Sequence, residues 1–334
     1  MSRPYQRTGR EWPTLLVLSY TVLGWAFGIW MLTSPEIWLN VTGVLLTAHA
    51  LVYSAYMIHD CAHDAVFLSR FANDRLGVLM GWINGACVAS YAGLKRKHLR
   101  HHADRLDVVT FDYRAALQRA PGWVRGAVLA LEWAYIPAVE LWMHGMVVVA
   151  PFWFGTVANR TRVLVVLGLR LALFAALALV SIKAVLLYAL AYMLFLSVLR
   201  FMDAFQHTYQ VYVSHSVEAV APDPRRDLQF EYANTYSNLI SERWWWLNVL
   251  VLNFSYHNAH HGRPGVPWYR LPKLHRSLFG DRNQQMISCR ELLAGYHRHR
   301  VARVLAEGCG TVGTGGNRAE QFLGAVGVSF LTAV

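Results

Sequence analysis

The sequence predicts an all-α integral membrane protein with four transmembrane helices in two hairpins and a cytoplasmic helical cap. Three observations support this prediction. The 334 residues are 55% hydrophobic and only 15% charged, against about 25% charged in an average soluble domain. Long apolar runs recur along the chain, and three histidine-rich clusters lie beside these runs. We expect one domain over residues 1–334, with its core at about residues 40–280.

The formal net charge of +11 limits the possible partners. Such a charge can indicate nucleic-acid binding, but here Arg and Lys lie beside apolar runs and form no separate basic domain. We therefore expect contact with anionic membrane lipid at the cytoplasmic face, and no nucleic acid. An acidic redox partner also fits this charge. The four cysteines form no Cys-x-x-Cys pair, which predicts free thiols.

The first predicted hairpin follows a basic N-terminus that contains Arg3, Arg7 and Arg10. An apolar run from residue 13 to about residue 31 is long enough to span a bilayer. A turn at residues 33–36 leads to a second span at about residues 37–58. The positive-inside rule places both ends of this hairpin in the cytoplasm, so that His59 leaves the membrane on that side.

The second hairpin is predicted within residues 163–199, with a break near Ser181-Ile182-Lys183. Arg170 would lie about 10 Å inside the third span at a rise of about 1.5 Å per residue. We interpret it as a snorkelling side chain rather than a substrate or headgroup contact. Two interrupted apolar stretches, residues 76–94 and 127–154, are predicted to be re-entrant or interfacial helices.

The C-terminal third of the chain is expected to stay on the cytoplasmic face. Residues 222–226 are typical of a surface loop. The run at residues 244–254 is too short to span and is rich in Trp, which indicates a membrane interface. Residues 308–316 are Gly-rich and predict a flexible connection. The apolar tail at residues 322–334 is expected to dock against the membrane or the core.

The histidine clusters have the spacing of metal ligands on helices. Residues four apart share one helix face, and residues three apart are also neighbours. Adjacent residues diverge by about 100°, so an adjacent histidine pair suits two different metals. Two such pairs predict a binuclear centre, for which imidazole suits iron, zinc, copper or nickel. The clustered histidines are His59, His63, His98, His101, His102, His257, His260 and His261.

The remaining histidines are assigned by their position. His207 follows the fourth span, four residues after Asp203, and is expected to be a further ligand. His49 lies about 15 Å from His59 along the second span by helical rise and is interpreted as a polar lining residue. The others are expected at the surface or an interface: His144, His215, His275, His297 and His299.

The three clusters resemble the histidine boxes of the membrane fatty acid desaturase family, which includes related hydroxylases and oxygenases. The boxes are HDCAH at 59–63, HLRHH at 98–102 and HNAHH at 257–261. Box order, spacing and intervening hairpins extend the resemblance over about residues 40–280. Several context residues add to it: Asp64, Asn73-Asp74-Arg75, Asp107, Gln206-His207-Thr208 and Asn234-Thr235-Tyr236.

This resemblance implies a non-haem di-iron centre and no catalytic residue beyond it. Asp203 would lie near an iron, through a water or beside a ligand, although some relatives have Asn there. Asp60, Asp64 and Asn258 are implied as residues that support the ligands. The implied ligands are His59, His63, His98, His101, His102, His207, His257, His260 and His261.

The resemblance implies an O2-dependent desaturase that introduces a double bond into a fatty acyl chain carried by a lipid, CoA or carrier protein. A hydroxylase or monooxygenase of an alkyl, terpenoid or other apolar small molecule remains the alternative. A metal transporter or sensor is disfavoured, because its ionisable residues should lie within the spans. The sequence shows no flavin or haem module. We therefore expect an external electron donor, such as a ferredoxin, to dock on the basic cytoplasmic face.

Overall fold

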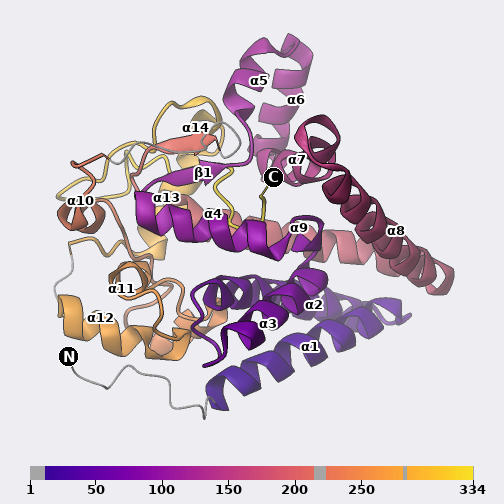
Figure 1. Cartoon of the computed structure of the whole chain (residues 1–334). Helices are drawn as coiled ribbons and strands as arrows, with labels where there is room; N and C mark the ends of the chain where they lie inside the picture. Colours follow the sequence, from indigo (N-terminus) through magenta and orange to yellow (C-terminus); the bar gives the residue numbers. More distant parts are fainter. Residues whose placement is uncertain (1–11, 214–222, 281–283, 334) are drawn as a thin grey trace.

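The computed structural model describes residues 12–213, 223–280 and 284–333 (Figure 1). Arg3, Arg7, Arg10, His215, Pro222 and Val334 lie outside the described residues. Within them the chain is mainly helical, as the sequence predicts. The first elements are α1 (Trp12–Thr33), α2 (Ile37–Ala62), α3 (Arg70–Asn84), η2 (Ala86–Val88), α4 (Tyr91–Asp104), β1 (Asp107–Val109), α5 (Tyr113–Arg119), α6 (Gly122–Trp133) and α7 (Ala138–Phe154). The later elements are α8 (Val157–Val180), α9 (Ile182–Ala204), β2 (Val211–Val213), α10 (Leu228–Ala233), η4 (Trp245–Val251), α11 (His257–Gly262), η5 (Trp268–Arg270), α12 (Leu271–Phe279), α13 (Cys289–His299) and α14 (Ala302–Leu305).

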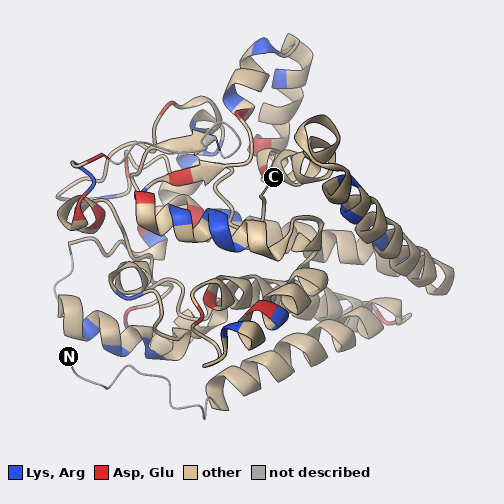
Figure 2. Ribbon diagram, viewed as in Figure 1, with Lys and Arg blue, Asp and Glu red and all other residues tan. Residues whose placement is uncertain are grey.

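Helices α1, α2, α8 and α9 are long and apolar enough to cross a membrane. They form two hairpins, and the break between α8 and α9 falls at Ser181, as predicted. Figure 2 shows no charged residue along α1. Helix α2 continues to Ala62, beyond its predicted end near Ile58, and so includes His59 in its last turn. This architecture fits an integral membrane protein.

The turns of the two hairpins meet at one end of the bundle, where Lys183 Nζ donates to the Ser34 carbonyl. Asn40 Nδ2 closes the first turn by donating to the carbonyls of Met31 at 3.0 Å and Ser34 at 2.9 Å. In the second turn, the Ser181 hydroxyl accepts from the Ala184 N–H at 3.1 Å and caps α9. The opposite ends of α2 and α9 therefore lie together, on the side of the cap (Figure 1).

The stretch predicted to be re-entrant or interfacial at residues 127–154 forms α6 and α7. The helix axis bends by 119° between them. Buried charges hold this bend: Arg200 of α9 pairs with Glu132 and lies 3.3 Å from Glu140 Oε2. Glu132 Oε1 also accepts from the Val139 N–H at 3.0 Å, across the bend. Removing one partner of such a buried group typically costs about 3–5 kcal/mol, so these charges fix the bend.

Arg170 does not snorkel, contrary to our interpretation. Its Nη1 donates to the Trp82 carbonyl at 2.7 Å, and its guanidinium lies 5.5 Å from the centre of the Phe174 ring. The last carbonyls of a helix have no partner within that helix, and Trp82 belongs to the last turn of α3. Arg170 therefore ties α8 to the end of α3.

The cap departs from the all-α prediction at one small sheet. Strand β1 pairs in parallel with β2, and Asp107 faces Val211 in the register. Strand β1 begins three residues after α4, which carries the second histidine cluster. The pairing holds this part of the chain beside the segment that follows α9. Two three-residue strands give little periodicity to read, which explains why the sequence did not reveal them.

The C-terminal tail docks against the protein core. Phe322 is fully buried, and the Ala325 N–H donates to the Ala204 carbonyl at 2.8 Å. The Gly-rich segment 308–316, predicted to be a flexible connection, contacts the tail through an antiparallel bridge between Gly310 and Phe322. The tail thereby reaches the ends of α9 and α4.

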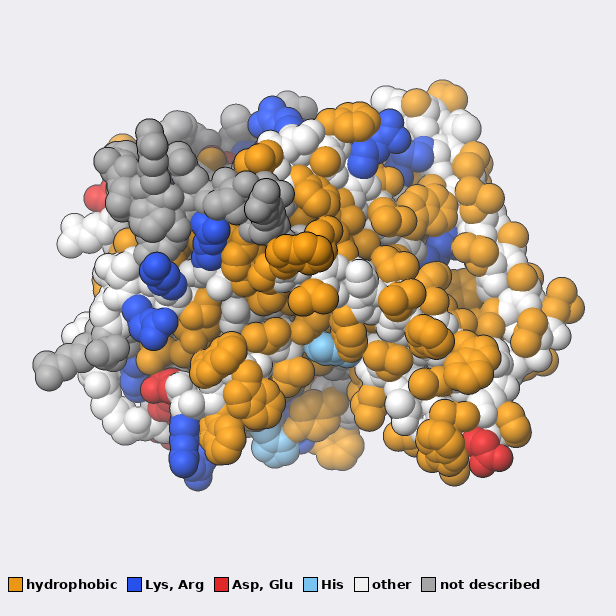
Figure 3. Space-filling model, turned by 90° about the horizontal axis from the view of Figure 1, so that it is seen from below, with side chains coloured by type: hydrophobic (Ala, Val, Ile, Leu, Met, Phe, Trp, Pro, Cys, Tyr) orange, Lys and Arg blue, Asp and Glu red, His pale blue; other side chains and the backbone are white. Residues whose placement is uncertain are grey.

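The surface on the α1 side is largely apolar. Figure 3 shows hydrophobic side chains over most of this face. Trp12 and Trp30, near the two ends of α1, are 69% and 62% exposed. Trp245 of η4 is 66% exposed, in the stretch predicted to lie at a membrane interface. Large exposed apolar faces mark membrane or protein contacts.

We predict that Gly28→Ala destabilises the first hairpin by about 1–3 kcal/mol. A Cβ at this position would lie 2.3 Å from Thr47 Oγ1 and 3.0 Å from Thr47 N, so α1 and α2 would have to separate. Thermal unfolding in detergent measures the effect. Gly168→Ala in α8 is the control, because its Cβ meets no atom within 4 Å. Equal losses of Tm in both variants would contradict the prediction.

Candidate metal centre

The histidine clusters converge where the hairpins meet the cap. His59 lies in the last turn of α2, and His63 is the C-terminal cap residue of that helix. The second cluster lies on α4 and the third on α11. His207 follows α9, and the neighbouring Thr208 N–H donates to the Asn234 carbonyl at 3.0 Å, which fixes this segment. The structure brings all nine histidines predicted as ligands to one place.

Their ring nitrogens form two groups, and within each group they lie within 4.8 Å of one another. Adjacent histidines separate: His101 and His102 belong to different groups, because neighbouring residues on a helix point about 100° apart. The arrangement is that of two metal sites side by side. The first group is His59, His63, His98, His102 and His260, and the second is His101, His207, His257 and His261.

The spacing of these nitrogens matches metal coordination. His63 Nε2 lies 2.7 Å from His98 Nε2, and His207 Nε2 lies 3.0 Å from the Nε2 atoms of both His257 and His261. Two nitrogens bound at right angles to one metal at about 2.1 Å would lie about 3 Å apart. His59 Nε2 is buried and has no hydrogen-bond partner among the described residues. A metal ion would supply the missing partner.

The pair His207 and His261 gives the sharpest test of fit. His207 Nδ1 lies 3.2 Å from Asp107 Oδ1, and His261 Nδ1 lies 2.9 Å from Glu231 Oε1. Burial lowers the pKa of His207 to about 4 and that of His261 well below its usual value, so both rings are neutral. A neutral ring that donates through Nδ1 carries a bare lone pair on Nε2. Two lone pairs that face each other at 3.0 Å repel unless a cation lies between them.

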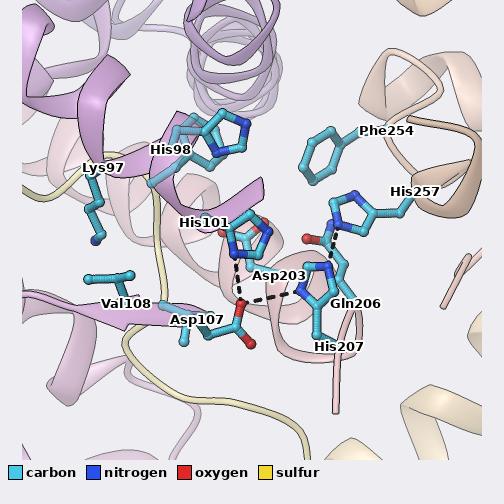
Figure 4. Close-up of a pocket in the computed structure, with 12 residues that line it drawn as sticks. Lys97, His98, His101, Asp107, Val108, Asp203, Gln206, His207, Phe254 and His257 are labelled. Atoms are coloured by element: carbon cyan, nitrogen blue, oxygen red, sulfur yellow. Dashed lines mark hydrogen bonds and ion pairs between the residues drawn. The ribbon is translucent and has the colours of Figure 1, made fainter. Parts of the chain in front are cut away.

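Carboxylates orient the rings from outside. Asp107 Oδ1 lies 3.3 Å from His101 Nδ1 and 3.2 Å from His207 Nδ1 (Figure 4), and His101 Nδ1 also lies 2.7 Å from the Leu106 carbonyl oxygen. Burial alone would raise the pKa of Asp107, but the two rings hold that pKa below its usual value. Asp60 Oδ1 lies 3.2 Å from His59 Nδ1. Ligating histidines in metalloproteins make such bonds to carboxylates, which fix the tautomer and ring orientation.

Glu231 is the main site residue that the sequence did not reveal. It lies on α10, accepts from His261 and also pairs with Arg105 Nε at 2.8 Å. Its carboxylate also groups with His102 and His261 as a possible direct ligand set. No spacing relates Glu231 to a histidine cluster, and the nearest sequence signal is the context motif that begins at Asn234. Asp107 had a weak signal, since it follows the second cluster closely.

Asp203 faces a small cavity between the histidines and the tail. This cavity measures about 40 Å3, and its lining includes His101, His257 and Phe330 (Figure 4). Both carboxylate oxygens of Asp203 are buried without a hydrogen-bond partner among the described residues. A cavity of this size holds a few water molecules. The position suits the expectation of a water-mediated contact with a metal.

Two other predicted supporting residues act at longer range. Asp64 contacts Lys95 at 2.9 Å and Arg70 at 3.2 Å, and so links the end of α2 to α4 rather than touching a ligand. Asn258 anchors the third cluster: its Nδ2 donates to the Thr235 carbonyl at 2.9 Å. Thr235 in turn forms an antiparallel bridge with His207.

The other described histidines lie outside the two groups. His49 joins α1 to η4 through Tyr20 Oη at 2.6 Å and the Leu250 carbonyl at 3.1 Å. His275, expected at the surface or an interface, is buried at 4% exposure. The reason is that it lies on the inner face of α12 and packs against Tyr256. His144 is half-buried, whereas His297 is exposed.

Helices long and apolar enough to cross a membrane and a convergent set of nine histidines, most of them buried, indicate a class, that of membrane proteins with a histidine cluster that could hold metal ions. The fatty acid desaturase family model matches residues 35–291, which is more than half of the chain. The chain therefore belongs to this family, and the predicted resemblance is confirmed. Membership implies an oxidoreductase that acts on an apolar lipid. No curated protein matches the chain significantly.

We predict that Glu231→Gln weakens metal retention by about 10–100-fold, the usual effect of losing a partner of a ligating histidine. The glutamine amide lacks the negative charge of the Glu231 carboxylate, so it accepts the hydrogen bond from His261 Nδ1–H more weakly. Chelator competition followed by metal analysis measures the change. Glu320→Gln is the control, because Glu320 pairs with Arg298 on the surface. Unchanged retention in Glu231→Gln would show that this carboxylate does not support the site.

The metal-free protein should lose stability as the pH falls below about 6.5. Burial, followed by the neighbouring rings, lowers the pKa of His257 and His260 well below their usual value of 6.5. Below pH 6.5 these histidines therefore bind protons in the unfolded chain but not in the folded chain, so acid favours unfolding. Tm measured from pH 8 to 5 after chelation tests this expectation. A His257→Gln variant should show a shallower slope, and a flat profile in the parent would contradict the prediction.

Proposed function

We propose that this protein is a multi-pass membrane desaturase that uses O2, two iron ions and external electrons to introduce a double bond into a fatty acyl chain. The observation that carries the proposal is the convergence of nine imidazoles in two groups, within a chain of the fatty acid desaturase family. Nitrogen ligands of this kind suit iron. Carboxylates dominate the soluble di-iron bundles instead.

The two groups of histidines would hold one iron each. A bound pair of irons supplies oxygen activation strong enough to remove hydrogen from an unactivated C–H bond. The protein's own contribution is to hold the rings neutral, to orient them through Asp60, Asp107 and Glu231, and to exclude water. Phe254 and Phe330 close the site on its apolar side, with ring centres 4.7 Å and 5.8 Å from that of His59.

Orientation and electron supply complete the proposal. We propose that the site lies at the membrane surface, where the two hairpins end, and on the cytoplasmic side, which the basic N-terminal residues favour. An acidic carrier such as a ferredoxin would dock on this face, drawn by the charge of +11. The substrate would enter as the chain of a membrane lipid or of a thioester.

We predict that His260→Ala abolishes product formation and lowers iron from about two ions per chain, because His260 Nε2 lies 3.1 Å from His102 Nε2 in the first group. The test compares lipids and small molecules from a host expressing either the parent or the variant. His297→Ala, at an exposed position on α13, is the control. A new double bond in the parent supports the proposal.

Three other results would overturn it or redirect it. A new hydroxyl in place of a double bond would make the enzyme a hydroxylase. Zinc alone, or no metal, in the purified parent would exclude a di-iron enzyme. Product formation that persists in His260→Ala would remove this histidine from the site. Membrane extraction of both variants shows whether they insert equally.

A further inference from the structure

The last residues of the chain lie between two cavities. Phe330 lines the small cavity beside the histidines, and the next residue, Leu331, lines a second, larger cavity. Both side chains are buried, at 8% and 2% exposure. This segment lies outside residues 35–291, so the family match assigns it no role.

The larger cavity has the size and lining of a site for an apolar chain. It measures about 600 Å3 and lies between α7, α8, α9 and the η2 turn. Ligand sites in proteins typically measure about 300–1,000 Å3 and are mostly apolar. Leu171 of α8 and Tyr192 of α9 belong to its wall. An aliphatic chain fits such a space, whereas the cavity of about 40 Å3 beside the histidines is too small for one.

The tail is clamped in this position. Lys97 Nζ of α4 donates to the Ser329 carbonyl at 2.9 Å and to the Thr332 carbonyl at 2.7 Å. The Thr110 hydroxyl donates to Thr332 Oγ1 at 2.8 Å. Upstream, the Gly327 N–H donates to Glu140 Oε1 at 3.1 Å. The turn at Phe330 and Leu331 is therefore held from both sides, which makes it a defined wall.

We propose that Phe330 and Leu331 form a partition that determines which part of a fatty acyl chain reaches the metal centre. The proposal rests on the proposed function, because it assigns the larger cavity to the acyl substrate. Adjacent residues of this turn line the two cavities, so a chain lying between α7, α8 and α9 would approach the histidines past it. The sizes of these two side chains then set how far the chain penetrates, and hence which carbons are presented.

Smaller side chains should open the partition. Leu331→Ala removes atoms from the wall of the larger cavity, and Phe330→Leu removes the ring that faces His59 and His98. The second substitution keeps an apolar side chain in the core and serves if the first variant does not fold. Leu173→Ala is the matched control, because it removes the same atoms from α8 at a side chain that is 62% exposed and lines neither cavity.

The experiment uses the purified full-length protein in detergent and saturated fatty acids with a photoreactive diazirine at the chain end. Mass spectrometry maps the labelled residues. In the parent protein we expect labels on the wall of the larger cavity, at Tyr192 or Leu331. In Leu331→Ala and Phe330→Leu we expect a several-fold rise of labels at residues of the small cavity, such as Phe254. Leu173→Ala should retain the parent pattern.

An unchanged pattern in both tail variants, or the same change in Leu173→Ala, would overturn the partition. The absence of labels from the larger cavity in the parent would also overturn it. Labelling needs neither iron nor turnover, so it separates this proposal from the proposed function. If the labelled positions shift in the tail variants but the parent makes no new double bond, the partition stands and only the proposed desaturase function is refuted. A desaturase whose labels do not move would refute only the partition.

Discussion

The central constraint on this structure is that bare imidazole nitrogens face one another at about 3 Å. Five contacts between Nε2 atoms have this spacing, and those of His207 with His257 and His261 are deeply buried. Neutral rings and a cation between them would stabilise such an arrangement. Burial favours the neutral form of the buried rings, and the carboxylates beside Nδ1 orient these rings. The long helices bring the ring-bearing segments together, since no local stretch of chain can gather nine rings.

The fold was largely predictable because the signals that define it are local. Apolar runs mark the four long helices, and the spacing of His59 and His63 places two rings at the end of one of them. Adjacent histidines also sorted correctly into two groups, because that depends only on helical geometry. Local signals did not predict the bend between α6 and α7. This bend depends on Arg200, which lies far from it in the sequence.

The missing parts of the prediction depend on contacts distant in sequence. Glu231 reaches His261 from 30 residues away, on a helix that no pattern joins to the histidine clusters. Arg170 looked like a snorkelling residue because it interrupts an apolar run, but its partner Trp82 lies 88 residues upstream. The tail was readable as apolar and hence as docked. Its position beside the histidines depends on Lys97, which donates to the carbonyls of Ser329 and Thr332. Nothing in the sequence around Lys97 indicates these two hydrogen bonds.

The contact between the two hairpin turns has a mechanical consequence. Lys183 and Ser34 join the hairpins at one end, and the histidines join them at the other, so the four long helices form a closed frame. With a rise of about 1.5 Å per residue, 24 residues span about 36 Å, more than a hydrocarbon core of about 30 Å. A helix that is too long tilts. Because the hairpins are joined at both ends, one hairpin cannot tilt without the other. A change in bilayer thickness would therefore displace α2 relative to α9 at the histidine site.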